Sequence, residues 1–148
     1  MIRVEYLKNC PEHVKTIVDW FYAKRWSGKW SVDEVVKKYE ILLNEDKLPL
    51  ALIAFLNDKP AATAIIFKQS LEIGLNVSPW VEGLFVKSKY RKSEIIKAMV
   101  SRIEDIVKKM NYNELYLSSS SERLFVDMGY NVMFMLDSGD KLLTRKFI

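Results

Sequence analysis

The chain has 148 residues, 49% of them hydrophobic and 28% charged, which is the balance of an ordinary globular protein. Lysines and arginines spread along the whole sequence give a net charge of +4, a pattern that is typical of a solvated surface and argues against nucleic-acid binding. A single cysteine cannot form an internal disulfide, and no apolar stretch reaches the roughly 20 residues of a membrane-spanning helix, so we expect one cytoplasmic domain over residues 1–148.

The N-terminal part of the sequence predicts an edge strand followed by two helices. Residues 2–7 alternate in polarity as an edge strand does, and Pro11 occupies the first turn of the helix that follows. After a break at Gly28, Ser31 and Glu34 form a capping-box pattern that predicts the start of the second helix. The apolar face of the first helix comprises Val14, Ile17, Val18 and Phe21.

The middle of the sequence predicts a hairpin, a third central strand and the longest helix. Two apolar stretches, 50–56 and 61–67, flank a turn composition and predict a hairpin, and residues 69–79 form a loop. A strand is predicted over 81–86 and a helix over 93–109, the latter from the strongest apolar periodicity in the chain. The apolar positions of this helix are Ile95, Ile96, Met99, Val100, Ile103 and Ile106.

The C-terminal part predicts a strand, a short helix and a final pair of strands. The strand covers residues 114–118 and the helix covers 121–128, with Gly129 as its C-cap. A turn at residues 138–140 then separates two strands. The order of elements alone predicts a mixed α+β protein.

Three pieces of this sequence occur together in the order and spacing of a known family. Residues 79–86, Pro-Trp-Val-Glu-Gly-Leu-Phe-Val, are followed after three residues by Tyr90 and Arg91, and residues 124–130 contain an aromatic-x-x-x-Gly-aromatic pattern. They resemble the GNAT acetyltransferase superfamily, in particular a subgroup with a Pro-Trp pair at the start of the fourth strand, and the similarity covers residues 49–147. The resemblance implies an α+β GNAT fold: a mixed, mostly antiparallel central sheet, splayed between strands 4 and 5 and flanked by about four helices.

The same resemblance implies a cofactor and a mechanism. Acetyl-CoA would bind between the fourth and fifth strands, with its pantetheine arm hydrogen-bonded like an added strand to the backbone of Leu84, Phe85 and Val86. An amine would then attack the thioester directly, with a backbone N–H polarising the carbonyl and no metal taking part. The base that deprotonates the amine would be Glu82, unless this residue is only a solvent-facing glutamate on an alternating strand.

The loop that binds the CoA pyrophosphate in this family, Gln/Arg-x-x-Gly-x-Gly/Ala, has lost its glycines here. Glu94 and Ile96 stand at the two small-residue positions. Ser93 and Glu94 could instead cap the helix themselves and leave no amide for a ligand. Four nearby cations still favour an anion: Lys87, Lys89, Arg91 and Lys92. The resemblance assigns these further cofactor-binding residues: Arg91, Lys92, Ser93, Glu94, Ile95, Ile96, Ser118 and Phe125.

A second departure from the family concerns the general acid. Phe125 stands where the family often has a tyrosine that protonates the leaving thiolate, and a phenyl ring has no proton to give. Tyr130 or a hydroxyl among residues 118–121 is the substitute that the sequence offers.

The resemblance as a whole predicts an N-acetyltransferase that moves an acetyl group from acetyl-CoA to a primary amine of a small molecule, peptide or protein. The alternative is a catalytically degenerate GNAT domain that binds a ligand or partner. The family recognises its acceptor with the first helices, where Trp20, Trp26 and Trp30 lie. Such residues more commonly pack a core or a dimer contact, and a homodimer is compatible with the sequence.

Overall fold

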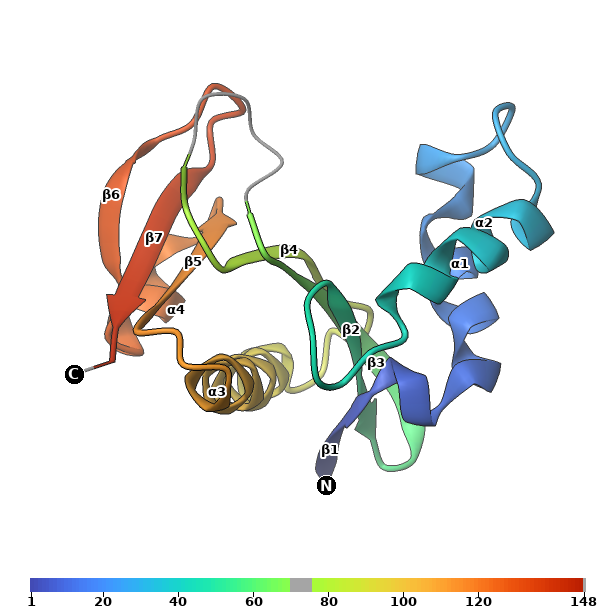
Figure 1. Cartoon of the computed structure of the whole chain (residues 1–148), viewed down its shortest axis with the longest axis horizontal. Helices are drawn as coiled ribbons and strands as arrows, with labels where there is room; N and C mark the ends of the chain where they lie inside the picture. The colour runs from blue at the N-terminus through green and yellow to red at the C-terminus, as the bar shows by residue number, and fades with distance from the viewer. Residues whose placement is uncertain (70–75, 148) are drawn as a thin grey trace.

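The computed structural model describes residues 1–69 and 76–147, which form a seven-stranded sheet and four α-helices (Figure 1). The strands are β1 (Ile2–Tyr6), β2 (Leu50–Leu56), β3 (Lys59–Phe67), β4 (Trp80–Val86), β5 (Glu114–Ser119), β6 (Asn131–Met135) and β7 (Lys141–Lys146). The helices are α1 (Val14–Arg25), α2 (Val32–Lys38), α3 (Lys92–Lys109) and α4 (Glu122–Asp127). None of these four helices is long and apolar enough to cross a membrane. The loop predicted over residues 69–79 falls partly outside the described residues.

The sheet is mixed and mostly antiparallel, as the sequence predicts. Its strands follow the order β1-β2-β3-β4-β5-β7-β6, and within this sheet only β4 and β5 run parallel. The predicted hairpin turns at Asn57 and Asp58, whose φ angles of 49° and 67° suit a tight two-residue turn between β2 and β3. Helices α1 and α2 lie on one face of β1–β4, and α3 lies on the other (Figure 1).

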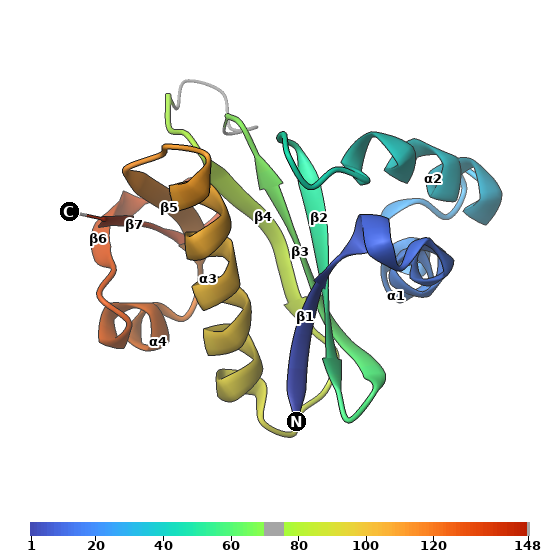
Figure 2. The ribbon, with the colours of Figure 1, turned by 60° about the horizontal axis from the view of Figure 1, so that its bottom comes forward.

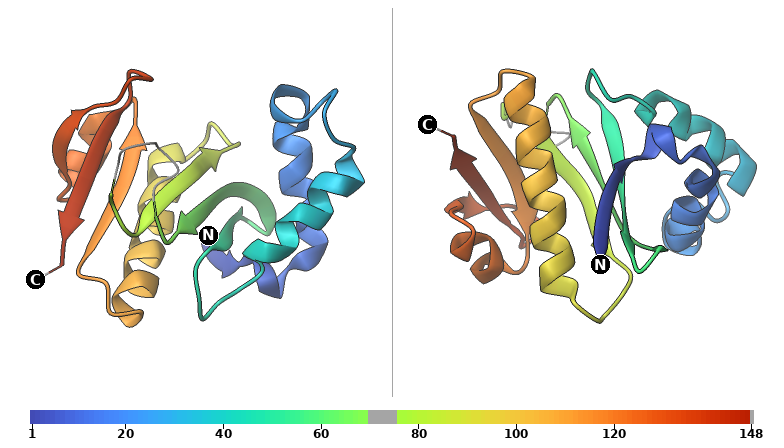
Figure 3. Two further views of the ribbon diagram at one scale, coloured as in Figure 1. Left: turned by 45° about the horizontal axis from the view of Figure 1, so that its top comes forward. Right: turned by 90° about the horizontal axis from the view of Figure 1, so that it is seen from below.

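The sheet separates where β4 meets β5, which confirms the predicted splay. The two strands pair at two positions, Trp80 with Tyr116 and Val81 with Leu117. β4 then continues to Val86, still paired with β3, and leaves its other edge without a neighbouring strand in the described sheet. Two views show α3 crossing the face of the sheet along this separation (Figure 3).

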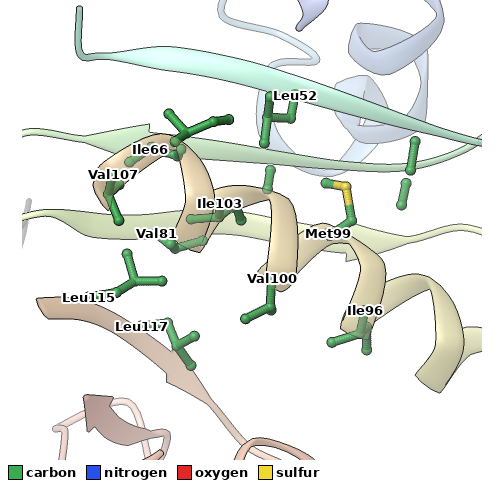
Figure 4. Close-up of a cluster of buried hydrophobic side chains, with 14 of the residues drawn as sticks. Leu52, Ile66, Val81, Ile96, Met99, Val100, Ile103, Val107, Leu115 and Leu117 are labelled. Atoms are coloured by element: carbon green, nitrogen blue, oxygen red, sulfur yellow. The ribbon is translucent and has the colours of Figure 1, made fainter. Parts of the chain in front are cut away.

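Helix α3 holds the two halves of the sheet together through one continuous apolar core. Each of the six apolar positions predicted for this helix is buried. All six belong to one cluster, and Figure 4 shows four of them, Ile96, Met99, Val100 and Ile103, between Leu52 and Ile66 on one side of the separation and Leu115 and Leu117 on the other. Because burying such a side chain contributes about 1.5–3 kcal/mol, this helix is the main link between the two halves.

The opposite face is covered by α1 and α2, whose local signals are also confirmed. The predicted apolar face of α1 is buried against β2. At the start of α2, Ser31 Oγ accepts from the Glu34 N–H at 3.1 Å, and the Ser31 N–H donates to Glu34 Oε1 at 2.9 Å. The hydrogen bond from the Ser31 backbone lowers the pKa of Glu34. The capping box therefore fixes the entry to α2 as the sequence predicts.

A partly buried cluster of polar side chains joins α3 to β7. Glu104 on α3 is 7% exposed and accepts hydrogen bonds from the Tyr130 hydroxyl at 2.7 Å and from Arg145 Nη1 at 3.0 and 3.1 Å. Desolvation is the largest cause that raises the pKa of Tyr130 well above its usual range, and the hydrogen bond to Glu104 is the next largest. Because that hydroxyl lies inside the core, Tyr130 is not placed to protonate a leaving group.

Replacing Glu104 tests this cluster. Glu104→Gln should lower the free energy of unfolding by about 2–3 kcal/mol, because an amide cannot pair with the arginine charge. Urea denaturation with an unchanged m-value measures this loss. The matched control is Glu45→Gln, which breaks the exposed 3.3 Å pair with Lys8 and should cost less than about 1 kcal/mol. Equal losses in the two variants would contradict the assignment.

The raised pKa of Tyr130 predicts that the free energy of unfolding falls at alkaline pH. The pKa of Tyr130 in the folded protein lies above the unfolded value of about 10, so this group stabilises the fold below about pH 10 and the contribution is lost as the pH rises further. In Tyr130→Phe, the free energy of unfolding should therefore fall less steeply than in the wild type between about pH 9.5 and 11. Denaturation curves measured across that range should differ in slope, and parallel slopes would refute the coupling.

Candidate functional site

A β-bulge in β4 shapes the separation of the strands. Between Thr63 and Ile65, β3 advances two residues, whereas β4 advances three between Phe85 and Glu82. The extra residue lies at Gly83 or Leu84, and Gly83 has a φ of 63°. Most residues with a Cβ are strained at this angle, so glycine is the residue type that the bulge favours.

The bulge determines which way the side chains of β4 point. Leu84 and Val86 join Val81 in the core under α3, whereas Phe85 packs against α1, with ring centroids 5.0 Å from Phe21. Strand alternation places Glu82 on the face opposite to Val81, which is the face of α1 and α2. Glu82 and Phe85 therefore share that face, although three positions separate them in the sequence.

The Glu82 carboxylate is half-buried and fixed at one oxygen. Its Oε2 accepts a hydrogen bond of 2.9 Å from the indole Nε1 of Trp80, whose side chain is 1% exposed. Among the described residues, its Oε1 has no hydrogen-bond or salt-bridge partner. Within the described structure, Trp80 therefore engages one carboxylate oxygen and leaves the other without a partner.

A pocket of about 580 Å³ lies beyond the end of β4, between the start of α3 and α4. Figure 2 shows the N-terminal half of α3 beside α4. Three of the lining residues are cations, so the pocket is electropositive. Its lining comprises Lys89, Arg91, Lys92, Ser93, Ile96, Ser121 and Leu124. The sequence did not single out Ser121 or Leu124 as cofactor-binding residues, because only the packing of α4 brings them here.

The first turn of α3 has free backbone amides. The helix begins at Lys92, and its first backbone hydrogen bond runs from the Ile95 N–H to the Arg91 carbonyl at 2.9 Å. Within residues 1–69 and 76–147, the N–H groups of residues 92–94 have no hydrogen-bond acceptor. The alternative, a self-capped start at Ser93 and Glu94, is therefore wrong, because the helix begins at Lys92 and no side chain caps it.

Glu94 is turned toward Arg91 and does not line the pocket. Its Oε2 lies 3.4 Å from Arg91 Nε, and its side chain is 58% exposed. Lys87, which the sequence grouped with the pocket cations, instead lies 5.7 Å from the ring centre of Trp20 on α1. The pocket thus keeps Lys89, Arg91 and Lys92 as its cations.

The remaining predicted cofactor residues lie outside the pocket lining. Ile95 is fully buried, and Phe125 is 3% exposed with its ring 6.2 Å from that of Tyr130. Ser118 is half-buried on β5, opposite Leu142. No group of three or more His, Cys, Asp or Glu side chains in the described ranges could hold a metal ion.

A second, smaller pocket lies on the α1 side of β4. It has a volume of about 250 Å³ and is lined by Asp19, Trp20, Phe85 and Lys87. Trp20 lies against Phe85, with ring centroids 5.9 Å apart. Because Glu82 and Phe85 share one face of β4, this pocket lies on the same face of the strand as Glu82.

The sequence matches the family model described as the acetyltransferase (GNAT) family over residues 15–130. The chain therefore belongs to the GNAT acetyltransferase family. A search of curated protein sequences finds no match.

Solved structures of acetyltransferases share the fold. An aminoglycoside 6'-acetyltransferase type Ii is 17% identical, with a TM-score of 0.70 over 100% of this chain and 97% of that one. The PaiA N-acetyltransferase from Thermoplasma acidophilum, in complex with coenzyme A, is 20% identical, with a TM-score of 0.65 over 99% of each chain. An aminoglycoside acetyltransferase AAC(6')-Ib, in complex with coenzyme A and kanamycin, is 11% identical, with a TM-score of 0.68 over 99% and 95%.

The positive φ of Gly83 gives a testable prediction for substitutions at this position. Gly83→Val should lower the free energy of unfolding by about 1–2 kcal/mol through backbone strain alone, since no described atom lies within 4 Å of the added Cβ. Gly83→Asn is the matched control and should cost less, because asparagine tolerates a positive φ. Urea denaturation compares the two variants. Equal costs would mean that the φ angle is not what selects glycine.

Proposed function

We propose that this protein is an N-acetyltransferase that transfers the acetyl group of acetyl-CoA to a primary amine. The observation that carries the proposal is the first turn of α3, where the free amides of residues 92–94 adjoin the electropositive pocket. Free amides, the positive end of a helix dipole and cations all favour a diphosphate. Membership of an acetyltransferase family and the coenzyme A present in similar structures support the CoA pyrophosphate as that ligand.

The free edge of β4 is the proposed site of the pantetheine arm. Beyond Val81, the backbone of β4 has no strand on its β5 side, so those N–H and C=O groups of residues 84–86 that point away from β3 are available to an extended ligand. An arm that adds to this edge gains main-chain hydrogen bonds in the manner of an added strand. Such an arm would lead from the pocket at the start of α3 toward the bulge, where Glu82 lies.

The proposed reaction is a direct acyl transfer. The amine nitrogen attacks the thioester carbonyl, a C–N bond forms, and the C–S bond breaks to release the CoA thiolate. Glu82 first takes a proton from the ammonium group of the acceptor at its free oxygen, Oε1, so that the neutral amine attacks. The tetrahedral intermediate then releases the second proton of the nitrogen to water. The tyrosine position holds the buried Phe125, and the Tyr130 hydroxyl is bonded to Glu104, so we assign no side chain as the acid and the thiolate is protonated by water.

The pocket of Asp19, Trp20, Phe85 and Lys87 is the proposed acceptor site. It lies on the same face of β4 as Glu82, so an amine held there approaches the separation from the α1 side. The Trp20 and Phe85 rings offer apolar surface. The Asp19 carboxylate, whose Oδ2 pairs with Lys15 at 2.9 Å, offers its other oxygen to a second ammonium group. Because similar structures are of aminoglycoside acetyltransferases, one of them with kanamycin, aminoglycosides are the first acceptors to test.

A catalytically inactive member of the family is the second candidate function. The observation that favours it is the loop at residues 91–96, where Glu94 and Ile96 stand at positions that the family fills with small residues. Such a protein would bind CoA or a partner without acetylating an amine. Measured turnover decides between the two functions.

The test of the proposed function combines binding with catalysis. Acetyl-CoA at 100 times its dissociation constant should stabilise the protein by about 2.7 kcal/mol in a thermal-shift experiment. Glu82→Gln should keep this stabilisation and lower kcat by about 100-fold or more, because it lacks the general base. Release of free CoA in the presence of kanamycin and other primary amines measures the rate.

Two outcomes would contradict the proposal. If millimolar acetyl-CoA does not stabilise the protein, acetyl-CoA is not its cofactor. If Glu82→Gln leaves the rate unchanged, Glu82 is not the general base. Binding without any turnover favours the inactive family member.

A further inference from the structure

Trp80 has no part in the reaction described above, yet its indole N–H is bonded to the proposed base. The Nε1–Oε2 distance is 2.9 Å, and the Trp80 side chain is 1% exposed. We propose that Trp80 is a positioning residue, which fixes the Glu82 carboxylate so that Oε1 alone is presented to the amine. This inference rests on the proposed function, because it assigns Trp80 a role that acts through Glu82.

Trp80 is itself held firmly enough to orient another side chain. Its backbone pairs with Phe67 on β3 and with Tyr116 on β5, at one of the two positions where the halves of the sheet still meet. Its indole packs in a small buried cluster with Val77 and Leu142. Glu82 lies just beyond the last paired position of β4 and β5, where no strand supports it on the β5 side. The hydrogen bond therefore connects a fixed side chain to one at the open edge.

The chemistry of the indole suits this role. An indole N–H donates a hydrogen bond but has no acceptor, so it neither takes nor relays the proton of the amine. The indole N–H bonds to Oε2, so the proton of the acceptor goes to Oε1. Trp80 and Glu82 lie two residues apart on one face of a strand, so their side chains are neighbours before the protein binds any ligand. The orientation of the base is thus built into β4.

A role in packing alone would give a different result from a role through Glu82. Phenylalanine keeps much of the apolar volume of tryptophan and removes the donor. If Trp80 acts through Glu82, the kinetic cost of Trp80→Phe should disappear once the carboxylate has gone. If Trp80 only packs, the cost should be the same with either residue at position 82.

The deciding experiment is a double-mutant cycle of the full chain with acetyl-CoA and an active acceptor. Trp80→Phe should lower kcat by about tenfold, because a hydrogen bond to a charged group is lost, and should leave the KM for acetyl-CoA within about twofold. In the Glu82→Gln background, Trp80→Phe should change kcat by less than about twofold. Equal losses in both backgrounds would overturn the positioning role and leave the proposed function standing.

A second measurement covers the case in which Trp80→Phe does not fold. The chain has four tryptophans, so four indole N–H signals are expected in a nitrogen-15 NMR spectrum. Single phenylalanine variants at Trp20, Trp26 and Trp30 identify the Trp80 signal by elimination. Glu82→Gln should move this signal more than the other three, and an unmoved signal would overturn the inference. A wild-type protein that acetylates no amine would contradict the proposed function and this inference with it.

Discussion

The arrangement of this protein depends on the place where β4 parts from β5. The strands pair at two positions only, and α3 packs across both halves of the sheet to keep them in one structure. The bulge at Gly83 then directs Leu84 toward the core and Phe85 toward α1. One short stretch of β4 thus provides a free backbone edge, a carboxylate and one wall of a pocket. The proposed acyl transfer uses all three features.

The start of α3 shows how the proposed anion site can keep its free amides without the glycines. Arg91 takes a φ of 57°, a left-handed conformation that glycine adopts more easily, and the helix begins directly after it. The same residue also pairs with Glu94 at 3.4 Å, and Glu94 does not line the pocket. Backbone amides carry no side-chain identity, so their direction matters more here than the residue type.

Local patterns predicted the elements well, and long-range contacts escaped them. Periodicity predicted the buried face of α3, and the Ser31–Glu34 pattern predicted its capping box, because both depend on residues a few positions apart. The start of α3 was misplaced by one residue, which was enough to make the predicted cap wrong. The partners of Glu104 lie 26 and 41 residues away in the sequence, so no local pattern predicts these contacts. The bond between Trp80 and Glu82 follows strand alternation and was open to prediction.

Hydrogen exchange with and without CoA tests most directly whether the separation of the strands is a cofactor site. The account predicts that CoA slows exchange in two places together: at those amides of residues 84–86 that point away from β3, on the free edge of β4, and at those of residues 92–94 at the start of α3. These amides should exchange fast in the free protein, because no strand in the described sheet covers this edge of β4 and no acceptor covers the first turn of α3. Protection at neither place, or only on the far strands β6 and β7, would contradict the account.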